Sequence, residues 1–130
     1  MSGLLFFVLL YSCTHKPQYQ VVPATMPATP TCDSTNIAYY KDIQPIFRNN
    51  CYECHSTAVT TGEGGLDLED TSSLKTYLKQ GFRGDGIYGS RLYHSLLHSQ
   101  NAQRMPPTYI LDSCSLHKIH YWLSVGAPVQ

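Results

Sequence analysis

Cys51, Cys54 and His55 stand in the spacing Cys-x-x-Cys-His, which places two thiols and an imidazole close together along the chain. Two thiols three residues apart can add to the two vinyl groups of one porphyrin, and the adjacent histidine then lies beneath the iron as its proximal ligand. This pattern is the attachment signature of haem c. We therefore predict one covalent haem c, with Cys51 and Cys54 as thioethers and His55 as an iron ligand.

Two other kinds of chemistry use the same residue types. A thioredoxin-like redox pair belongs to a βαβ context, whereas the apolar pattern around Cys51 is helical. A structural zinc ion needs four ligands, usually from two paired motifs, and the sequence has no second Cys-x-x-Cys. The haem interpretation is favoured, and a non-haem metal-binding module is the alternative.

The sixth iron ligand decides what the iron does, because methionine opposite histidine raises the reduction potential and fills the site for electron transfer. Met105 is the candidate, since Pro106 and Pro107 stiffen the loop that carries it. Core packing is the alternative role for Met105. Bis-histidine ligation is a rival, because further histidines lie on predicted helices: His94, His98, His117 and His120. If Met105 is not bound, the open iron indicates a haem-based sensor or a peroxidase-like protein.

The elements that position these residues are expected to be helices, because apolar residues recur at helical spacing. A first helix is expected from about Asp42 to Asn49, with Pro45 tolerated only in its first turn, and it leaves Cys51 on a turn of its own. The other expected helices run from an N-cap at Thr71 to Gly81, from a cap at Ser90 to about His98, and from an N-cap at Asp112 to Gly126.

The predicted fold class is all-α, with about four short helices and long loops around one covalent haem. Residues 66–68 are expected to be irregular. Four short helices form a small core, so a large buried prosthetic group would supply much of the missing apolar contact. The apolar residues expected near the haem or in the helix core are Leu66, Leu68, Leu74, Leu92, Leu96, Trp122 and Leu123.

The length and charge of the chain limit its organisation and its partners. Its 130 residues correspond to about one domain. Charged residues make up 14%, and nine Lys and Arg balance nine Asp and Glu. Because no basic field is present to hold nucleic acid, we exclude that class of partner and expect proteins or small redox molecules.

The N-terminal residues are expected to direct export. The apolar run within residues 1–10 is far shorter than the ~20 residues that span a bilayer, and it has the character of a signal peptide. Leu10-Tyr-Ser-Cys13 resembles the lipobox of bacterial lipoproteins, which makes Cys13 a lipid anchor; an ordinary secretory signal is the alternative. We predict a signal peptide at 1–12, a lipid anchor and proline-rich tether at 13–31, and a folded domain at 32–130.

Two further cysteines, Cys32 and Cys114, remain out of five. In an exported protein they can form a disulfide, and two free buried thiols are the alternative.

Several short segments along the chain form a specific set. They are Tyr40-Lys-Asp-Ile-Gln-Pro-Ile-Phe47, Cys51-x-x-Cys-His-Ser56, Gly65-Leu-Asp-Leu68, Met105-Pro106 and Trp122-Leu-Ser-Val-Gly-Ala127. Across about residues 32–128 the chain resembles the single-haem cytochrome c domains found in bacterial lipoproteins and fused to dehydrogenases. The resemblance implies a class I cytochrome c fold for residues 32–130.

The resemblance also implies roles for individual residues. Cys51 and Cys54 would be thioethers, His55 the proximal ligand and Met105 the distal ligand, and it suggests that Cys32 and Cys114 pair. We therefore expect an exported, lipid-anchored monohaem electron carrier, not an enzyme. Its partner would be a redox protein such as a dehydrogenase or an oxidase, on the periplasmic side or at a membrane.

Overall fold

A computed structural model describes residues 32–59 and 65–130 of the chain. Residues Cys32–Gln130 form one compact unit. Its described part is helical and contains no strand, so the prediction of an all-α, cytochrome c-like fold is confirmed. None of the helices in this part is long and apolar enough to cross a lipid bilayer. The predicted signal peptide (1–12), the anchor Cys13 and the tether (13–31) lie outside the described residues.

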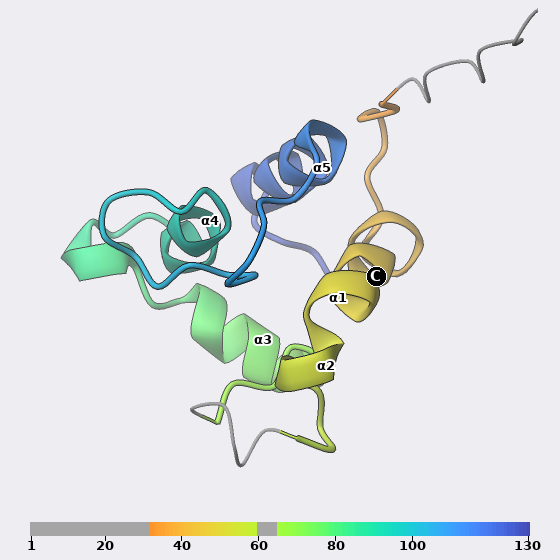
Figure 1. Cartoon of the computed structure of the whole chain (residues 1–130). Coiled ribbons are helices and arrows are strands. Elements are labelled where there is room, and N and C mark those ends of the chain that lie inside the picture. The colour runs from red at the N-terminus through yellow and green to blue at the C-terminus, as the bar shows by residue number, and fades with distance from the viewer. Residues whose placement is uncertain (1–31, 60–64) are drawn as a thin grey trace, which may run out of the picture. The chain divides into compact units, whose positions relative to one another are not determined.

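Five α-helices and two short helical turns make up the described part of the unit (Figure 1). The α-helices are α1 (Gln44–Asn50), α2 (Tyr52–His55), α3 (Thr71–Leu78), α4 (Ser90–Leu96) and α5 (Ser113–Ser124). A π-helical turn, η1 (Tyr39–Ile43), leads into α1, and a 3₁₀ turn, η2 (Phe82–Gly84), lies between α3 and α4. The four predicted helices are therefore present, and α2 forms the turn expected at Cys51.

The start of α5 is as predicted, whereas the predicted start of α3 is wrong by one residue. Asp112 caps α5, because its side chain accepts a hydrogen bond of 3.0 Å from Ser115 N. The cap of α3 is Asp70 instead of Thr71, since the Asp70 carboxylate accepts from Ser73 N at 2.9 Å. A carboxylate directly before the helix can satisfy its free N–H groups, so Thr71 becomes the first helical residue.

The predicted limits of α4 also need correction. Its N-cap is Gly89, which has a left-handed φ of 72° and gives no side-chain hydrogen bond. The Ser90 hydroxyl is used elsewhere: it accepts from Phe82 N at 2.8 Å and donates to Asp85 Oδ1 at 2.9 Å. The helix ends at Leu96, before His98, whose φ of 51° is not helical.

The apolar core gathers around Trp122 of α5. The Trp122 ring lies 5.6 Å from the ring of Tyr39 and 6.0 Å from that of Phe47, and all three side chains are fully buried. The indole N–H donates to Pro128 O at 2.9 Å, which satisfies the one polar atom of this ring. The predicted core residues Leu68, Leu74, Leu92, Leu96 and Leu123 are also buried, and Leu66 is partly buried against them.

A disulfide and an ion pair tie the first described residues to α5. Cys32 and Cys114 are bonded with an S–S distance of 2.10 Å and a Cα–Cα distance of 5.4 Å. Lys118 Nζ lies 3.0 Å from Asp42 Oδ1, so a second link joins the turn before α1 to α5. The covalent link is the one that the resemblance suggested.

Candidate haem-binding site

Helix α2 presents the residues of the Cys-x-x-Cys-His motif. It starts directly after Cys51 and ends at His55, and His55 N donates a hydrogen bond of 2.8 Å to Cys51 O. Side chains at i, i+3 and i+4 share one face of a helical turn, so Cys51, Cys54 and His55 are presented together. Cys54 is exposed and Cys51 is partly buried.

A backbone carbonyl orients the imidazole of His55. Its Nδ1 lies 3.2 Å from Leu66 O, and because a carbonyl can only accept, Nδ1 carries the proton. Nε2 then keeps a free lone pair, which is the form in which a neutral histidine binds iron. Leu68 N also donates to His55 O at 2.8 Å, so the backbone of the proposed ligand is held as well.

The buried carboxylate of Asp67 fixes the segment that follows the motif. One oxygen accepts from Glu69 N at 2.9 Å and Asp70 N at 3.0 Å, and the other accepts from Thr57 Oγ1 at 2.7 Å. Burial raises the pKa of Asp67, but the hydrogen bonds outweigh this effect and leave the pKa below its ordinary value. The ionised carboxylate therefore links the residues after His55 to the start of α3.

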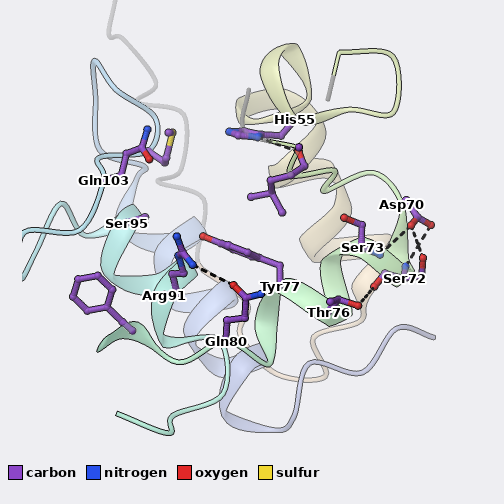
Figure 2. A pocket seen from close by; sticks show the side chains of 14 residues that line it. His55, Asp70, Ser72, Ser73, Thr76, Tyr77, Gln80, Arg91, Ser95 and Gln103 are labelled. Carbon is purple, nitrogen blue, oxygen red and sulfur yellow. Dashed lines mark hydrogen bonds between the residues drawn. The ribbon is translucent and has the colours of Figure 1, made fainter. Parts of the chain in front are cut away.

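A cavity of about 740 Å³ is walled by α2, α3, α4 and the loop before α5. This volume falls within the range of roughly 300–1,000 Å³ that is typical of cofactor sites. Both proposed iron ligands, His55 and Met105, line it, and so does Leu66. Figure 2 shows His55 on one side and Gln103 on the other, with Tyr77 reaching across the cavity. The residues present therefore fit a large planar group bound between a histidine and a methionine.

Two hydrogen bonds hold the loop that carries Met105. Met105 N donates to Ser95 O of α4 at 3.1 Å. The next residue, Pro106, is buried, and its carbonyl accepts from His98 Nε2 at 3.0 Å. The backbone on both sides of the Met105 Cα is thus attached, to α4 through Ser95 and to the turn after α4 through His98, which restricts where the sulfur can lie.

A third bond connects this loop to the helix before the motif. Tyr109 donates from its hydroxyl to Asn50 Oδ1 at 2.9 Å, across 59 residues of sequence. The Asn50 amide in turn donates to Ile46 O at 2.7 Å, which orients its side chain. Because Asn50 directly precedes Cys51, this bond joins the loop of Met105 to the proposed haem-attachment segment.

The alternatives of a redox dithiol and a zinc site find no support in this geometry. Burial raises the pKa of the Cys51 thiol to about 12, whereas a reactive dithiol needs a lowered pKa. No group of three or more His, Cys, Asp or Glu residues within 32–59 and 65–130 is arranged to hold a metal ion. A thiol that remains neutral and buried is compatible with a thioether position.

None of the rival histidines lines the large cavity. The His98 imidazole donates its Nε2 hydrogen bond to Pro106 O, and His117 is exposed. His94 and His120 line a separate cavity of about 370 Å³. The His94 ring lies 5.4 Å from the ring of Phe82, and the His120 ring lies 4.9 Å from that of Tyr93. Among the described residues, His55 is the histidine that belongs to the site. Trp122 does not line it either and belongs to the core.

Sequence reasoning missed the polar wall of the cavity. α3 contributes Ser73, Thr76 and Tyr77 at the spacing i, i+3 and i+4, while Leu74 and Leu78 of the same helix are buried in the core. Gln80 follows just after the end of this helix. α4 contributes Arg91 and Ser95 at i and i+4. The available signal was a polar stripe beside an apolar stripe, which ordinarily marks a face exposed to solvent.

The family described as Planctomycete cytochrome C matches residues 51–108 of the chain, from the Cys-x-x-Cys-His motif to just past Met105. No curated protein matches the chain. No solved structure matches it either. The matched segment contains both proposed iron ligands and every residue that lines the cavity, so residues 51–108 carry a cytochrome c-like domain.

Proposed function

We propose that this chain is an exported, lipid-anchored monohaem c-type cytochrome that carries single electrons between redox partners. In this proposal Cys51 and Cys54 form the thioethers, His55 is the proximal ligand and Met105 is the distal ligand. The observation that carries it is that His55 and Met105, 50 positions apart in the sequence, line the same cavity. The family match over residues 51–108 supports the same assignment.

The residues of the chain have two tasks in this function. The Leu66 carbonyl keeps the Nδ1 proton of His55 in place, so that Nε2 remains the ligating nitrogen. The hydrogen bonds that Met105 N and the His98 imidazole donate hold the loop that carries the thioether of Met105. Haem bound there supplies one-electron exchange at its iron, and methionine ligation raises the reduction potential. If His55 and Met105 both held the iron, no open position would remain on it, so no substrate chemistry is expected.

Export and anchoring rest on separate observations. The disulfide Cys32–Cys114 is typical of a chain that folds in an oxidising compartment, and attachment of haem c agrees with export. Anchoring through a lipid on Cys13 rests on the lipobox-like sequence alone. The partner that we propose is a redox protein such as a dehydrogenase or an oxidase, because the domain carries no charge pattern for nucleic acid.

Intact-mass measurement of the protein from a haem-maturing host tests the attachment. We expect the added mass of one haem, a shifted haemochrome band when either Cys51 or Cys54 is replaced by Ala, and no covalent haem in the double variant. Wild-type protein without added haem mass would refute the proposed function.

Replacement of Met105 by Ala tests the axial ligand. The variant should lose the methionine–iron charge-transfer band, have a lower reduction potential and bind cyanide readily, because one iron position becomes open. His98→Ala is the comparison, since that imidazole bonds the same loop without lining the cavity. If His98→Ala loses the axial ligand and Met105→Ala does not, the methionine assignment is wrong.

A further inference from the structure

The large cavity has a polar end that a porphyrin ring does not require. Tyr77 of α3, Gln80 just after this helix and Arg91 of α4 line this end. The ring system of haem is apolar, but its two propionate side chains are carboxylates that need hydrogen-bond donors or positive charge when they leave bulk water. Polar side chains also line the opposite end, near Asp70, so the charges at the two ends decide where these carboxylates lie.

We propose that Arg91 and Gln80 form the binding subsite for the propionate carboxylates of the haem, and that they fix which edge of the porphyrin faces this end of the cavity. The inference rests on the proposed haem function. The two residues of this subsite belong neither to the Cys-x-x-Cys-His motif nor to the proposed iron ligands.

Charge inside the cavity selects this end. Apart from the proposed ligand His55, the ionisable acidic or basic side chains that line it are Asp70 and Arg91. The Asp70 carboxylate already accepts hydrogen bonds from the start of α3, and hydrogen bonds with Ser72 and Ser73 lower its pKa, so it is ionised. Figure 2 shows Asp70 and Arg91 at opposite ends of the cavity. A second carboxylate is repelled near Asp70 and attracted near Arg91.

Two contacts orient the guanidinium of Arg91 at this end of the cavity. Its Nη1 donates to Gln80 Oε1 at 3.1 Å, and its Cζ lies 5.7 Å from the centre of the Tyr77 ring. Arginine has five N–H donors in a planar fork, and the bond to Gln80 uses one of them. The remaining donors can bind a carboxylate in the bidentate geometry that arginine favours. The Gln80 side-chain nitrogen adds a further donor beside it.

A neighbouring arginine offers a matched control. Arg83 stacks over the Phe82 ring at 5.2 Å and, like Arg91, is exposed, but it does not line the cavity. Arg91→Gln and Arg83→Gln therefore remove the same charge, one inside and one outside the proposed subsite. Arg91→Lys keeps the charge and loses the planar fork.

The first measurement is the reduction potential of the three holo variants. Arg91→Gln should lower the potential, because an uncompensated carboxylate beside the haem favours the oxidised iron. Arg83→Gln should change it much less, and Arg91→Lys should restore part of the loss. The visible spectrum should keep its methionine band in all three, which separates this effect from unfolding. Equal shifts in Arg91→Gln and Arg83→Gln would overturn the proposal.

The second measurement identifies the ligand group. In the Cys51→Ala/Cys54→Ala background, which removes covalent attachment, affinity is measured for haem and for haem dimethyl ester. Arg91→Gln should weaken haem binding about tenfold, as expected for loss of one charge-assisted hydrogen bond, and should leave ester binding unchanged. Equal weakening for both ligands contradicts a carboxylate contact. Absence of covalent haem in the wild type would refute the proposed function instead.

Discussion

Gly89, the N-cap of α4, packs against Leu123 of α5, and a single methyl group added here should have a large effect on stability. Its φ of 72° lies in the left-handed region, where L-residues are strained. A Cβ built on this residue would lie 2.3 Å from Leu123 Cδ2 and 3.2 Å from Leu123 Cγ. The Leu123 side chain is only 7% exposed, so it has little room to move away. Gly89→Ala should therefore strain both the backbone and the packing between the two helices.

Two separate terms set the expected magnitude. A left-handed conformation disfavours an L-residue by about 1–2 kcal/mol. Overpacking in a buried contact destabilises by about 1–3 kcal/mol. The free energy of unfolding should thus fall by about 2–5 kcal/mol in Gly89→Ala. Gly84→Ala is the matched control, because Gly84 has a φ of 77° but no atom within 4 Å of its built Cβ. This control should show the backbone term alone.

Thermal and guanidinium unfolding of the holo protein measure the difference. For a domain of this size, each kcal/mol lowers the thermal midpoint by about 4–8 °C. The midpoint of Gly89→Ala should be reduced about 1.5 to 4 times as much as that of Gly84→Ala. The same shift in both variants would show that the Leu123 side chain moves aside without loss of stability, and the packing argument would be refuted.

Two further predictions concern cross-links of the fold. Cys32→Ser should lower the free energy of unfolding by up to about 4 kcal/mol without changing the haem spectrum, because the disulfide closes a loop of 82 residues; free thiols in unfolded, unreduced wild-type protein would contradict it. Tyr109→Phe removes the hydrogen bond to Asn50 and should loosen the loop of Met105, so that cyanide binds the iron severalfold more tightly than in the wild type. Tyr121→Phe, at another exposed tyrosine, should not change cyanide binding, and equal effects would disprove the positioning role of Tyr109.

The sequence predicted those parts of the fold that depend on neighbours along the chain. The apolar spacing located α1, α3, α4 and α5, and the cap at Asp112 is correct because the carboxylate is followed directly by the helix that it caps. The cap residues predicted at Thr71 and Ser90 are wrong for different reasons. Asp70 competes locally with Thr71, whereas Ser90 is taken by a loop contact to Asp85 that only the folded chain creates.

The candidate site was predictable in part for the same reason. The Cys-x-x-Cys-His motif is local, and Met105 stands out beside its two prolines. The polar end of the cavity is built from Gln80, which lies just after α3, and Arg91 of α4, which is 11 residues further along the chain. Their meeting depends on how α3 packs on α4, and periodicity within one helix contains no information about that packing.

The two proposed axial ligands and the polar end of the cavity are held in different ways. His55 and Met105 are positioned through backbone groups: the Leu66 carbonyl fixes the imidazole, and the Ser95 carbonyl binds Met105 N. These two bonds persist when the side chains at residues 66 and 95 change, although the loop of Met105 also depends on the side chains of His98 and Tyr109. The contact between Arg91 and Gln80 depends on side chains, and one substitution can remove it. Substitutions at this end can therefore alter the charge near the haem, and with it the reduction potential, while the axial ligands stay in place.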